Sequence, residues 1–271
     1  MLQPSSCVKQ QNKYIGLKMN KSPLVISFYT AGSLYEEEAR QMQASCKNFD
    51  VECHIEEVPS RGTWVQNCAI KPSFILEKML QFQRPVVWVD ADARFKGRPV
   101  WATFADGDIA VHVNHHYHKE HRAYVETGTL FVNPTPASVQ LLKRWEEACK
   151  SVQRGDDDGL DQVILARILG EARDVRLIAL PLPYIKIIPR DEGLVSAEET
   201  IIEHHVVSCK PNSSLLDDDQ IREFLKKKKA CGLAGIVDYH PSMLRQAGDC
   251  CFFPITLCSF FRRHHACGFY V

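Results

Sequence analysis

Two aspartates, Asp90 and Asp92, stand one residue apart directly after the apolar run Val86–Val89. This run is rich in β-branched side chains and follows a proline, which is typical of a strand buried on both faces of a sheet. Open α/β sheets bind their ligands beyond the carboxyl ends of such strands. Two carboxylates held there are costly unless positive charge lies close by. The pattern therefore predicts a site for a divalent metal ion that carries a diphosphate group.

An Asp-x-Asp triplet also arises by chance, and on an exposed loop it is simply a pair of solvated carboxylates. The buried strand before Asp90 argues against that interpretation, because it brings the pair to the edge of the sheet. Magnesium and manganese prefer oxygen ligands, and carboxylates together with phosphate oxygens are their usual partners. We therefore expect Mn²⁺ or Mg²⁺ as the cofactor.

The elements around these aspartates alternate between strands and helices. Apolar runs predict strands at residues 24–29, 51–58, 86–90, 109–113, 128–132, 175–180 and 201–207. Apolar residues at helical spacing predict helices at residues 33–48, 64–81, 137–150 and 159–169. This order favours an α/β fold, a single Rossmann-like domain with a mostly parallel central sheet flanked by helices.

Composition narrows the class of protein. The chain has 271 residues, of which 45% are hydrophobic, so one large domain can bury a sizeable core. Basic and acidic residues both total 33, and this balance disfavours nucleic acid as a partner. The eleven scattered cysteines favour free thiols in a reducing, cytoplasmic setting. We expect neither a signal peptide nor a transmembrane segment, because no apolar stretch is long enough.

The motif Asp90-Ala91-Asp92 resembles the DxD motif of the GT-A nucleotide-sugar glycosyltransferases. Other segments match this family in its own order between residues 24 and 211. They are Phe28-Tyr29-Thr30 with Tyr35, the pattern W-x-x-N-x-x-x-K-P at Trp64, Asn67, Lys71 and Pro72, the stretch from Glu126 to Phe131 with its G-x-x-F, the pair Asp161-Gln162, and the stretch from His205 to Pro211. The last is similar to the glycogenin-like signature H-x-x-G-x-x-K-P, but it has serine for glycine and its lysine comes one residue early.

The resemblance implies a GT-A-like fold and a metal-dependent, hexosyltransferase-type glycosyltransferase. Such an enzyme transfers a sugar from a nucleotide-diphosphate sugar, here expected to be a UDP-sugar, to an acceptor hydroxyl, and its metal ion neutralises the departing diphosphate. The implied metal ligands are Asp90, Asp92 and His205. The implied donor contacts are Thr30, Tyr35, Trp64, Asn67, Lys71, Asp90 and Lys210. Together with the polar composition of the N-terminus, the resemblance gives three expected regions: a polar leader at 1–22, a GT-A-like catalytic domain at 23–231, and a Cys/Phe-rich tail at 232–271 that is unassigned.

The acceptor side has three candidate catalytic residues, Asp158, Asp161 and Glu126. An inverting reaction needs one of them as a base, whereas a retaining reaction relies on a well-placed donor phosphate. Acidic residues at the start of a helix also serve as capping groups, and this applies to Asp158 and Asp161. The sequence leaves open the stereochemistry, and also whether the acceptor is a glycan, a protein or a small molecule.

Other interpretations compete with glycosyl transfer. Lysines such as Lys71 are commonly solvated, aromatic residues near helix starts are commonly core, and His205 can be a surface histidine. A haloacid-dehalogenase-like phosphatase also carries Asp-x-Asp after a strand, but it has threonine or valine where this chain has Arg94. A nucleotidyltransferase has a more glycine-rich first loop than Thr30-Ala31-Gly32-Ser33. A non-catalytic module that binds a nucleotide sugar or an effector partner remains the main alternative.

Overall fold

The computed structural model describes residues 22–115, 124–156, 159–188 and 190–205. The predicted leader up to residue 21, Asp158 and Lys210 lie outside the described residues. So do the end of the predicted catalytic domain, from residue 206, and the whole tail at 232–271.

Strands and helices alternate along the described chain. In order they are β1 (Leu24–Thr30), α2 (Tyr35–Asn48), β2 (Cys53–Val58), α3 (Trp64–Cys68), α4 (Lys71–Phe82), β3 (Val86–Val89), β4 (Ala93–Phe95), the 3-10 helix η2 (Trp101–Phe104), β5 (Ile109–Val113), β6 (Val125–Val132), α5 (Pro136–Arg154), α6 (Asp161–Glu171), β7 (Leu177–Ala179), the 3-10 helix η3 (Leu182–Tyr184), β8 (Lys186–Ile187) and β9 (Ile202–His204). None of the helices in the described ranges has the length and apolar character that crossing a membrane requires.

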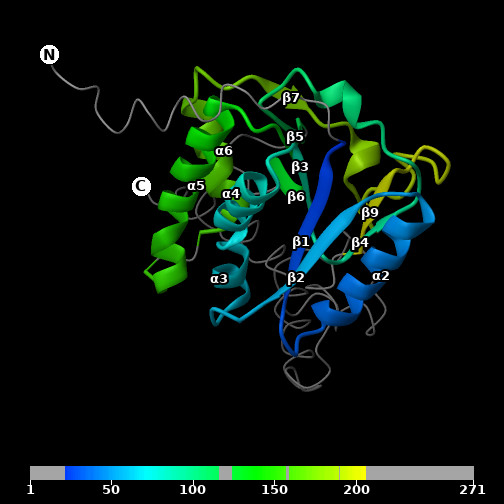
Figure 1. Cartoon of the computed structure of the whole chain (residues 1–271), viewed down its shortest axis with the longest axis horizontal. Coiled ribbons are helices and arrows are strands. Elements are labelled where there is room, and N and C mark those ends of the chain that lie inside the picture. Colours follow the sequence, from blue (N-terminus) through cyan, green and yellow to red (C-terminus); the bar gives the residue numbers. More distant parts are fainter. Residues whose placement is uncertain (1–21, 116–123, 157–158, 189, 206–271) are drawn as a thin grey trace, which may run out of the picture. The chain divides into compact units, whose positions relative to one another are not determined.

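The central sheet has six strands in the order β2-β1-β3-β6-β5-β7 (Figure 1). Strand β1 pairs in parallel with β2 and β3, and β5 pairs in parallel with β7. Strand β6 is antiparallel to both of its neighbours, β3 and β5. All strands except β6 therefore run in one direction, and the prediction of a mostly parallel α/β sheet is confirmed.

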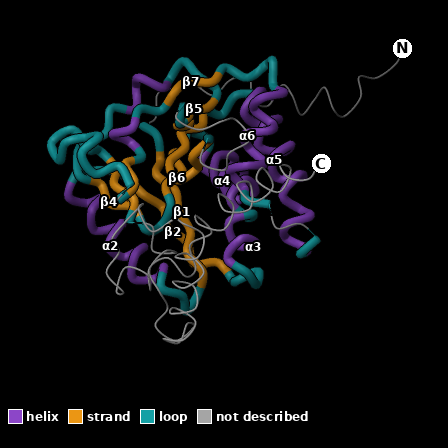
Figure 2. Tube along the Cα trace, turned by 180° about the vertical axis from the view of Figure 1, so that it is seen from behind, coloured by secondary structure: helices purple, strands orange, loops and turns teal. Residues whose placement is uncertain are grey.

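Both faces of the sheet are covered by helices. Leu24 and Ile26 of β1 pack in an apolar cluster with α4, α5 and α6, whereas Val25 packs in a second cluster with α2. Figures 1 and 2 show these helices on opposite sides of the sheet. Successive side chains of a strand point to opposite faces, so a strand covered on both sides must be apolar throughout. This explains the continuous apolar runs that marked β1 and β3 in the sequence.

A second, three-stranded sheet has the order β4-β9-β8 and lies next to the aspartate motif. Strand β4 begins directly after Asp92 and pairs antiparallel with β9, so that Ala93 lies opposite His204. Strand β9 lies within the predicted strand at 201–207, whereas β4 and β8 were not predicted from the sequence, because two or three residues are too few for a periodic pattern. The pairing of β4 with β9 brings the end of the described chain back to the aspartates.

The predicted helix at 64–81 is two helices, α3 and α4, with a break at Ala69 and Ile70. Pro72 explains the break: in one continuous helix its ring would collide with the carbonyl of Cys68, where α3 ends, and it has no N–H to donate. As the second residue of α4, Pro72 is instead well tolerated.

Candidate metal and donor site

The two aspartates lie in a tight turn at the carboxyl end of β3. The backbone N–H of Asp90 donates to the carbonyl of Gly128 in β6 at 2.8 Å, and the N–H of Ala93 donates to the carbonyl of Asp90 at 3.0 Å. The carbonyl of Asp92 accepts the N–H of His205 at 3.1 Å. Backbone hydrogen bonds to the middle of β6, the start of β4 and the residue after β9 therefore fix the turn in the place that the sequence predicted.

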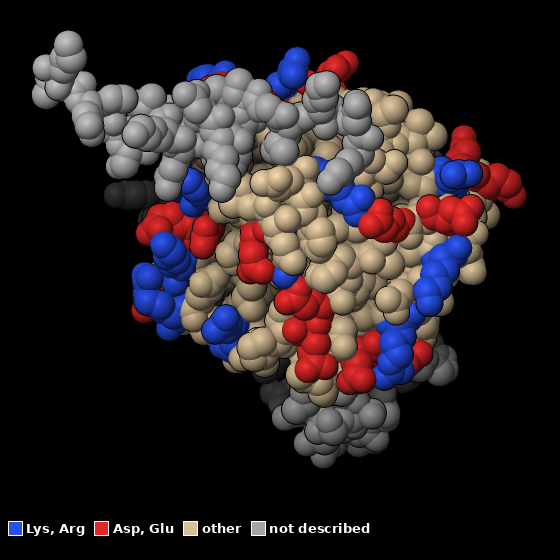
Figure 3. Space-filling model, viewed as in Figure 1, with Lys and Arg blue, Asp and Glu red and all other residues tan. Residues whose placement is uncertain are grey.

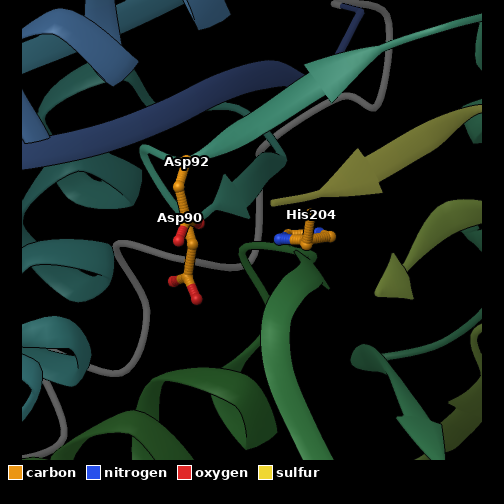
Figure 4. Close-up of side chains that lie close together, drawn as sticks. All are labelled: Asp90, Asp92 and His204. Carbon is orange, nitrogen blue, oxygen red and sulfur yellow. The ribbon is translucent and has the colours of Figure 1, made fainter. Parts of the chain in front are cut away.

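The carboxylates of Asp90 and Asp92 form a cluster with the imidazole of His204. One ligand atom from each residue lies within 4.8 Å of the others, and Figure 4 shows the ring with a nitrogen turned towards the two acidic groups. Asp92 is only 7% exposed and His204 only 3%. Asp90 is only partly buried, and it opens the cluster to ligands from solvent. Two carboxylates and one imidazole form a ligand set that suits a divalent metal ion.

One oxygen of Asp90 is already held by the protein. Its Oδ1 accepts a hydrogen bond from the indole N–H of Trp88 at 2.8 Å and lies 3.2 Å from the ammonium of Lys71. Its Oδ2 lies on the side of His204, since a methyl group placed on Gly128 would touch both Oδ2 and the imidazole. The carboxylate of Asp90 is thus oriented with one oxygen towards the candidate metal position.

The structure brings His204, and not His205, to the two aspartates. The Nε2 of His204 shares a hydrogen bond of 2.9 Å with the hydroxyl of Thr129, which leaves Nδ1 for another partner. Burial lowers the pKa of His204 to about 3, so the ring is neutral near pH 7 and keeps a lone pair. The Nε2 of His205 lies instead 3.0 Å from a carboxylate oxygen of Glu203. Metal ligation by His205 stays a prediction, and His204 is the histidine that the geometry supports.

A signal for His204 was present in the sequence. Counted back from Lys210 and Pro211, the spacing of H-x-x-G-x-x-K-P begins at His204, with Val207 at the glycine position. Counting from His205 instead required a misplaced lysine. The number of residues between the histidine and the lysine therefore indicates His204, whereas aligning Ser208 with the glycine of the signature indicated His205.

Lys71 lies in a buried network that joins the metal-side aspartate to α6. Its ammonium is 3.2 Å from Asp90, 3.0 Å from Asp161 and 3.0 Å from the hydroxyl of Thr127. The hydroxyl of Thr127 in turn donates to Asp161 at 3.0 Å. Burial by itself would lower the pKa of Lys71, but the carboxylates of Asp161 and Asp90 raise it above its ordinary value. Lys71 is therefore a fixed positive charge, whereas its contact with donor phosphates stays a prediction.

The other acceptor-side candidate, Glu126, is also paired. Arg190 donates to its two oxygens at 2.6 and 3.1 Å, a bidentate arrangement, and the same guanidinium donates to Asp191. Glu126 is almost fully buried. Glu126 and Asp161 thus both lie in ion pairs with buried or half-buried cations, and this arrangement holds elements together. A role for either of them as a base stays a prediction.

Four predicted donor residues lie at the carboxyl ends of β1 and β2, the same edge of the sheet as Asp90. Thr30 ends β1 and pairs with Val58, which ends β2. The indole N–H of Trp64 donates to the hydroxyl of Tyr35 at 3.2 Å, and Trp64 as a whole residue remains 40% exposed. The side-chain oxygen of Asn67 accepts the N–H of Arg61 at 2.7 Å and so shapes the loop after β2. The structure gathers these residues at one edge, and their contact with a donor stays a prediction.

Comparison with known proteins agrees with this geometry. The family model of the nucleotide-diphospho-sugar transferases matches residues 40–207, which is more than half of the chain. The chain belongs to this family. A crystal structure of a glycosyltransferase involved in the glycosylation of the major capsid of PBCV-1 matches with a TM-score of 0.53 and 11% sequence identity, over 68% of this chain and 95% of that chain. This likeness concerns the fold, and the GT-A-like α/β fold is confirmed. No curated protein matches the chain significantly.

The surface of this transferase carries mixed charge. On the face shown in Figure 3, lysine and arginine side chains lie interspersed with aspartate and glutamate over an otherwise uncharged surface. Basic and acidic residues also balance over the whole chain, whose formal net charge is zero. Nucleic-acid recognition needs a broad basic surface, and this face does not offer one among the described residues.

Gly128 provides the first test of the transferase site. A methyl group at this position would lie 3.0 Å from Cε1 and 3.2 Å from Nδ1 of His204. We expect Gly128→Ala to displace the ring and to weaken Mn²⁺ binding about 10- to 100-fold, as measured by isothermal titration calorimetry. Gly170→Ala in α6 is the matched control, because a methyl group there meets nothing within 4 Å. Equal metal affinity in the two variants would exclude His204 as a ligand.

Proposed function

We propose that this transferase moves a hexosyl group from a nucleotide-diphosphate sugar, with a UDP-sugar as the expected donor, to an acceptor hydroxyl, and that the reaction depends on a divalent metal ion. The observation that carries the proposal is the cluster of Asp90, Asp92 and His204 at the carboxyl end of β3, in a chain that belongs to a family of nucleotide-diphospho-sugar transferases. The acceptor is a hydroxyl of a glycan, a protein or a small molecule.

The ligand set fits Mn²⁺ or Mg²⁺. Asp90 and Asp92 offer the oxygen atoms that both ions prefer, and the neutral ring of His204 offers a nitrogen that Mn²⁺ accepts more readily than Mg²⁺ does. When bound, such an ion neutralises the charge that develops on the diphosphate as the sugar leaves.

The residues of the chain contribute by holding these groups in place before the reaction. Lys71 and Trp88 fix one oxygen of Asp90, and Thr129 fixes the ring of His204. Preorganised groups in a site that excludes water need no rearrangement when charge develops, which is a large source of rate acceleration. We assign positioning roles to Asp161 and Glu126, because each is paired with a cation. Asp158 is proposed to contact the acceptor.

The pair formed by half-buried Tyr35 and exposed Trp64 is proposed to bind the nucleotide base. The hydrogen bond between the two side chains fixes the indole while 40% of Trp64 stays exposed to solvent. An exposed and immobilised aromatic surface at the ligand-binding edge of the sheet favours stacking with a flat heterocycle. Thr30 and Asn67 lie at the same edge and are proposed to contact the nucleoside, and Lys210 the phosphates.

A thermal-shift panel of nucleotide sugars tests this proposal. We expect one uridine nucleotide sugar to raise the unfolding temperature in the presence of Mn²⁺, to have little effect in EDTA, and to be hydrolysed slowly when no acceptor is added. The control is the double variant Asp90→Ala and Asp92→Ala, which should show neither effect. Metal-dependent stabilisation without hydrolysis or transfer would support the non-catalytic binding module instead, and no stabilisation by any nucleotide sugar would contradict both.

The alternative of a haloacid-dehalogenase-like phosphatase has less support. Two strands, β1 and β2, precede the aspartate motif, whereas that motif normally opens the phosphatase fold. The proposed catalytic domain spans residues 23–231. A cytoplasmic location is also a proposal, supported by the thiols of Cys46, Cys53 and Cys68, which form no disulfide.

A further inference from the structure

Two cysteines, Cys46 and Cys53, lie together on the side of the sheet that α2 covers. Cys46 belongs to the last turn of α2 and is fully buried, whereas Cys53 begins the edge strand β2 and is half-buried. The short connection at residues 49–52 turns back on itself, and the N–H of Val51 donates to the carbonyl of Cys46 at 2.9 Å. Both side chains pack in the apolar cluster that contains Val25 and Met42.

The two thiols are hydrogen-bonded to each other, and neither is in a disulfide. The hydrogen bond from Cys46 lowers the pKa of Cys53, and Lys47 lowers it further, while burial opposes both. The same hydrogen bond, together with burial, raises the pKa of Cys46. Because Cys53 is half-buried and Cys46 is fully buried, Cys53 is the accessible thiol of the pair, and Cys46 lies next to it.

We propose that Cys46 and Cys53 are a peroxide-sensitive dithiol that closes to an intramolecular disulfide. In the first step the Cys53 thiolate attacks one oxygen of hydrogen peroxide, the O–O bond breaks, and Cys53 becomes a sulfenic acid. The departing hydroxide takes up the proton that Cys53 lost on ionisation and forms water. In the second step the sulfur of Cys46 attacks the sulfur of Cys53, and the S–O bond breaks. The departing hydroxide takes the thiol proton of Cys46 and forms water. Two thiols are thus oxidised by two electrons, and one peroxide is reduced to two molecules of water.

The disulfide would tie the end of α2 to the edge of the sheet. Ser45, next to Cys46, accepts the backbone N–H of Phe95 in β4 at 3.0 Å, so the same helical turn also contacts the strand that follows Asp92. Cys149, by contrast, packs in the cluster on the opposite face of the sheet. The geometry thus favours bonding between Cys46 and Cys53 over bonding of either with Cys149.

Trypsin makes this proposal directly testable, because cleavage after Lys47 separates the two cysteines. The peptides 41–47 and 48–61 each contain a single cysteine, Cys46 and Cys53 respectively. The native full-length protein is treated with hydrogen peroxide, its remaining thiols are alkylated, and the digest is analysed by mass spectrometry. We expect the two peptides to appear joined, lighter by two hydrogen atoms than their sum, and to be recovered separately after reduction. The peptide that contains Cys149 should remain alkylated.

Cys53→Ser is the matched variant, and it should leave Cys46 alkylated after the same treatment. The proposal is overturned if native peroxide-treated protein yields Cys46 and Cys53 on separate alkylated peptides. It is equally overturned if Cys53 ends as a sulfenic or sulfinic acid while Cys46 is still an alkylated thiol, or if either cysteine is joined to a different peptide.

Discussion

Replacing Asp92 by asparagine is expected to lower the kcat/KM for the proposed sugar transfer by on the order of 10³-fold, because it removes a charged ligand of the proposed metal ion. Asparagine keeps the size of the side chain and one oxygen atom. The loss should therefore come from charge and not from packing. The measurement is steady-state transfer, or hydrolysis of the nucleotide sugar, in saturating Mn²⁺.

Stability separates this effect from a folding defect. Ligand oxygens of Asp90 and Asp92 lie within 4.8 Å of each other, so the two carboxylates repel when no cation is bound. Asp92→Asn should therefore unfold at the temperature of the wild-type protein or above it in EDTA, but should lose the stabilisation that Mn²⁺ gives. Asp174→Asn, at an exposed position, is the control and should behave like the wild type. Full activity of Asp92→Asn with Mn²⁺ would contradict the proposed metal site.

Replacing Lys71 by methionine is expected to lower the free energy of unfolding by about 3–5 kcal/mol. Lys71 is 5% exposed and Asp161 is 4% exposed, and the lysine supplies the positive charge between Asp161 and Asp90. Methionine preserves the packing of the aliphatic stem but leaves the carboxylate of Asp161 buried without its cation. Urea unfolding of the purified variant, monitored by circular dichroism, measures the loss.

Lys78→Met is a matched control on the same helix. Lys78 is also buried and also lies over an aromatic ring, but its carboxylate partners, Glu56 and Glu77, are 40% and 66% exposed. Those partners stay solvated when the lysine is removed, so the loss should be about 1 kcal/mol or less. Adding Asp161→Asn to Lys71→Met should recover part of the stability, since it removes the unpaired charge. If the two lysine variants were equally stable, the buried network would not hold α4 to α6.

Much of the fold could be predicted because its signals are local. The apolar runs of β1 and β3 and the helical spacing of α2 and α5 are properties of neighbouring residues, and the structure has these elements close to the predicted bounds. The short strands β4 and β8 and the break before α4 were missed. Two or three residues carry no periodicity, and the effect of Pro72 depends on the carbonyl four residues before it.

The residues of the candidate site were likewise predictable from the sequence only in part. Asp90 and Asp92 could be located from the strand before them, whereas the choice between His204 and His205 depends on the pairing of β9 with β4. A shift of one residue along a strand turns a side chain to the opposite face, and the pairing of Ala93 with His204 settles which ring faces the aspartates. The sequence also predicted Lys71 as a functional cation, but not that Asp161, on a helix far along the chain, would share it.

What the sequence alone determined is therefore the class of protein, an α/β transferase with a carboxylate pair after its third strand. Strand burial and motif order could be predicted because they depend on consecutive residues. Only the tertiary structure decided which groups meet these carboxylates. Contacts such as Lys71 with Asp161, Thr129 with His204 and Arg190 with Glu126 join residues from separate elements. They form only when the sheet and its helices pack, because packing sets the distances and the burial on which each ion pair and hydrogen bond depends.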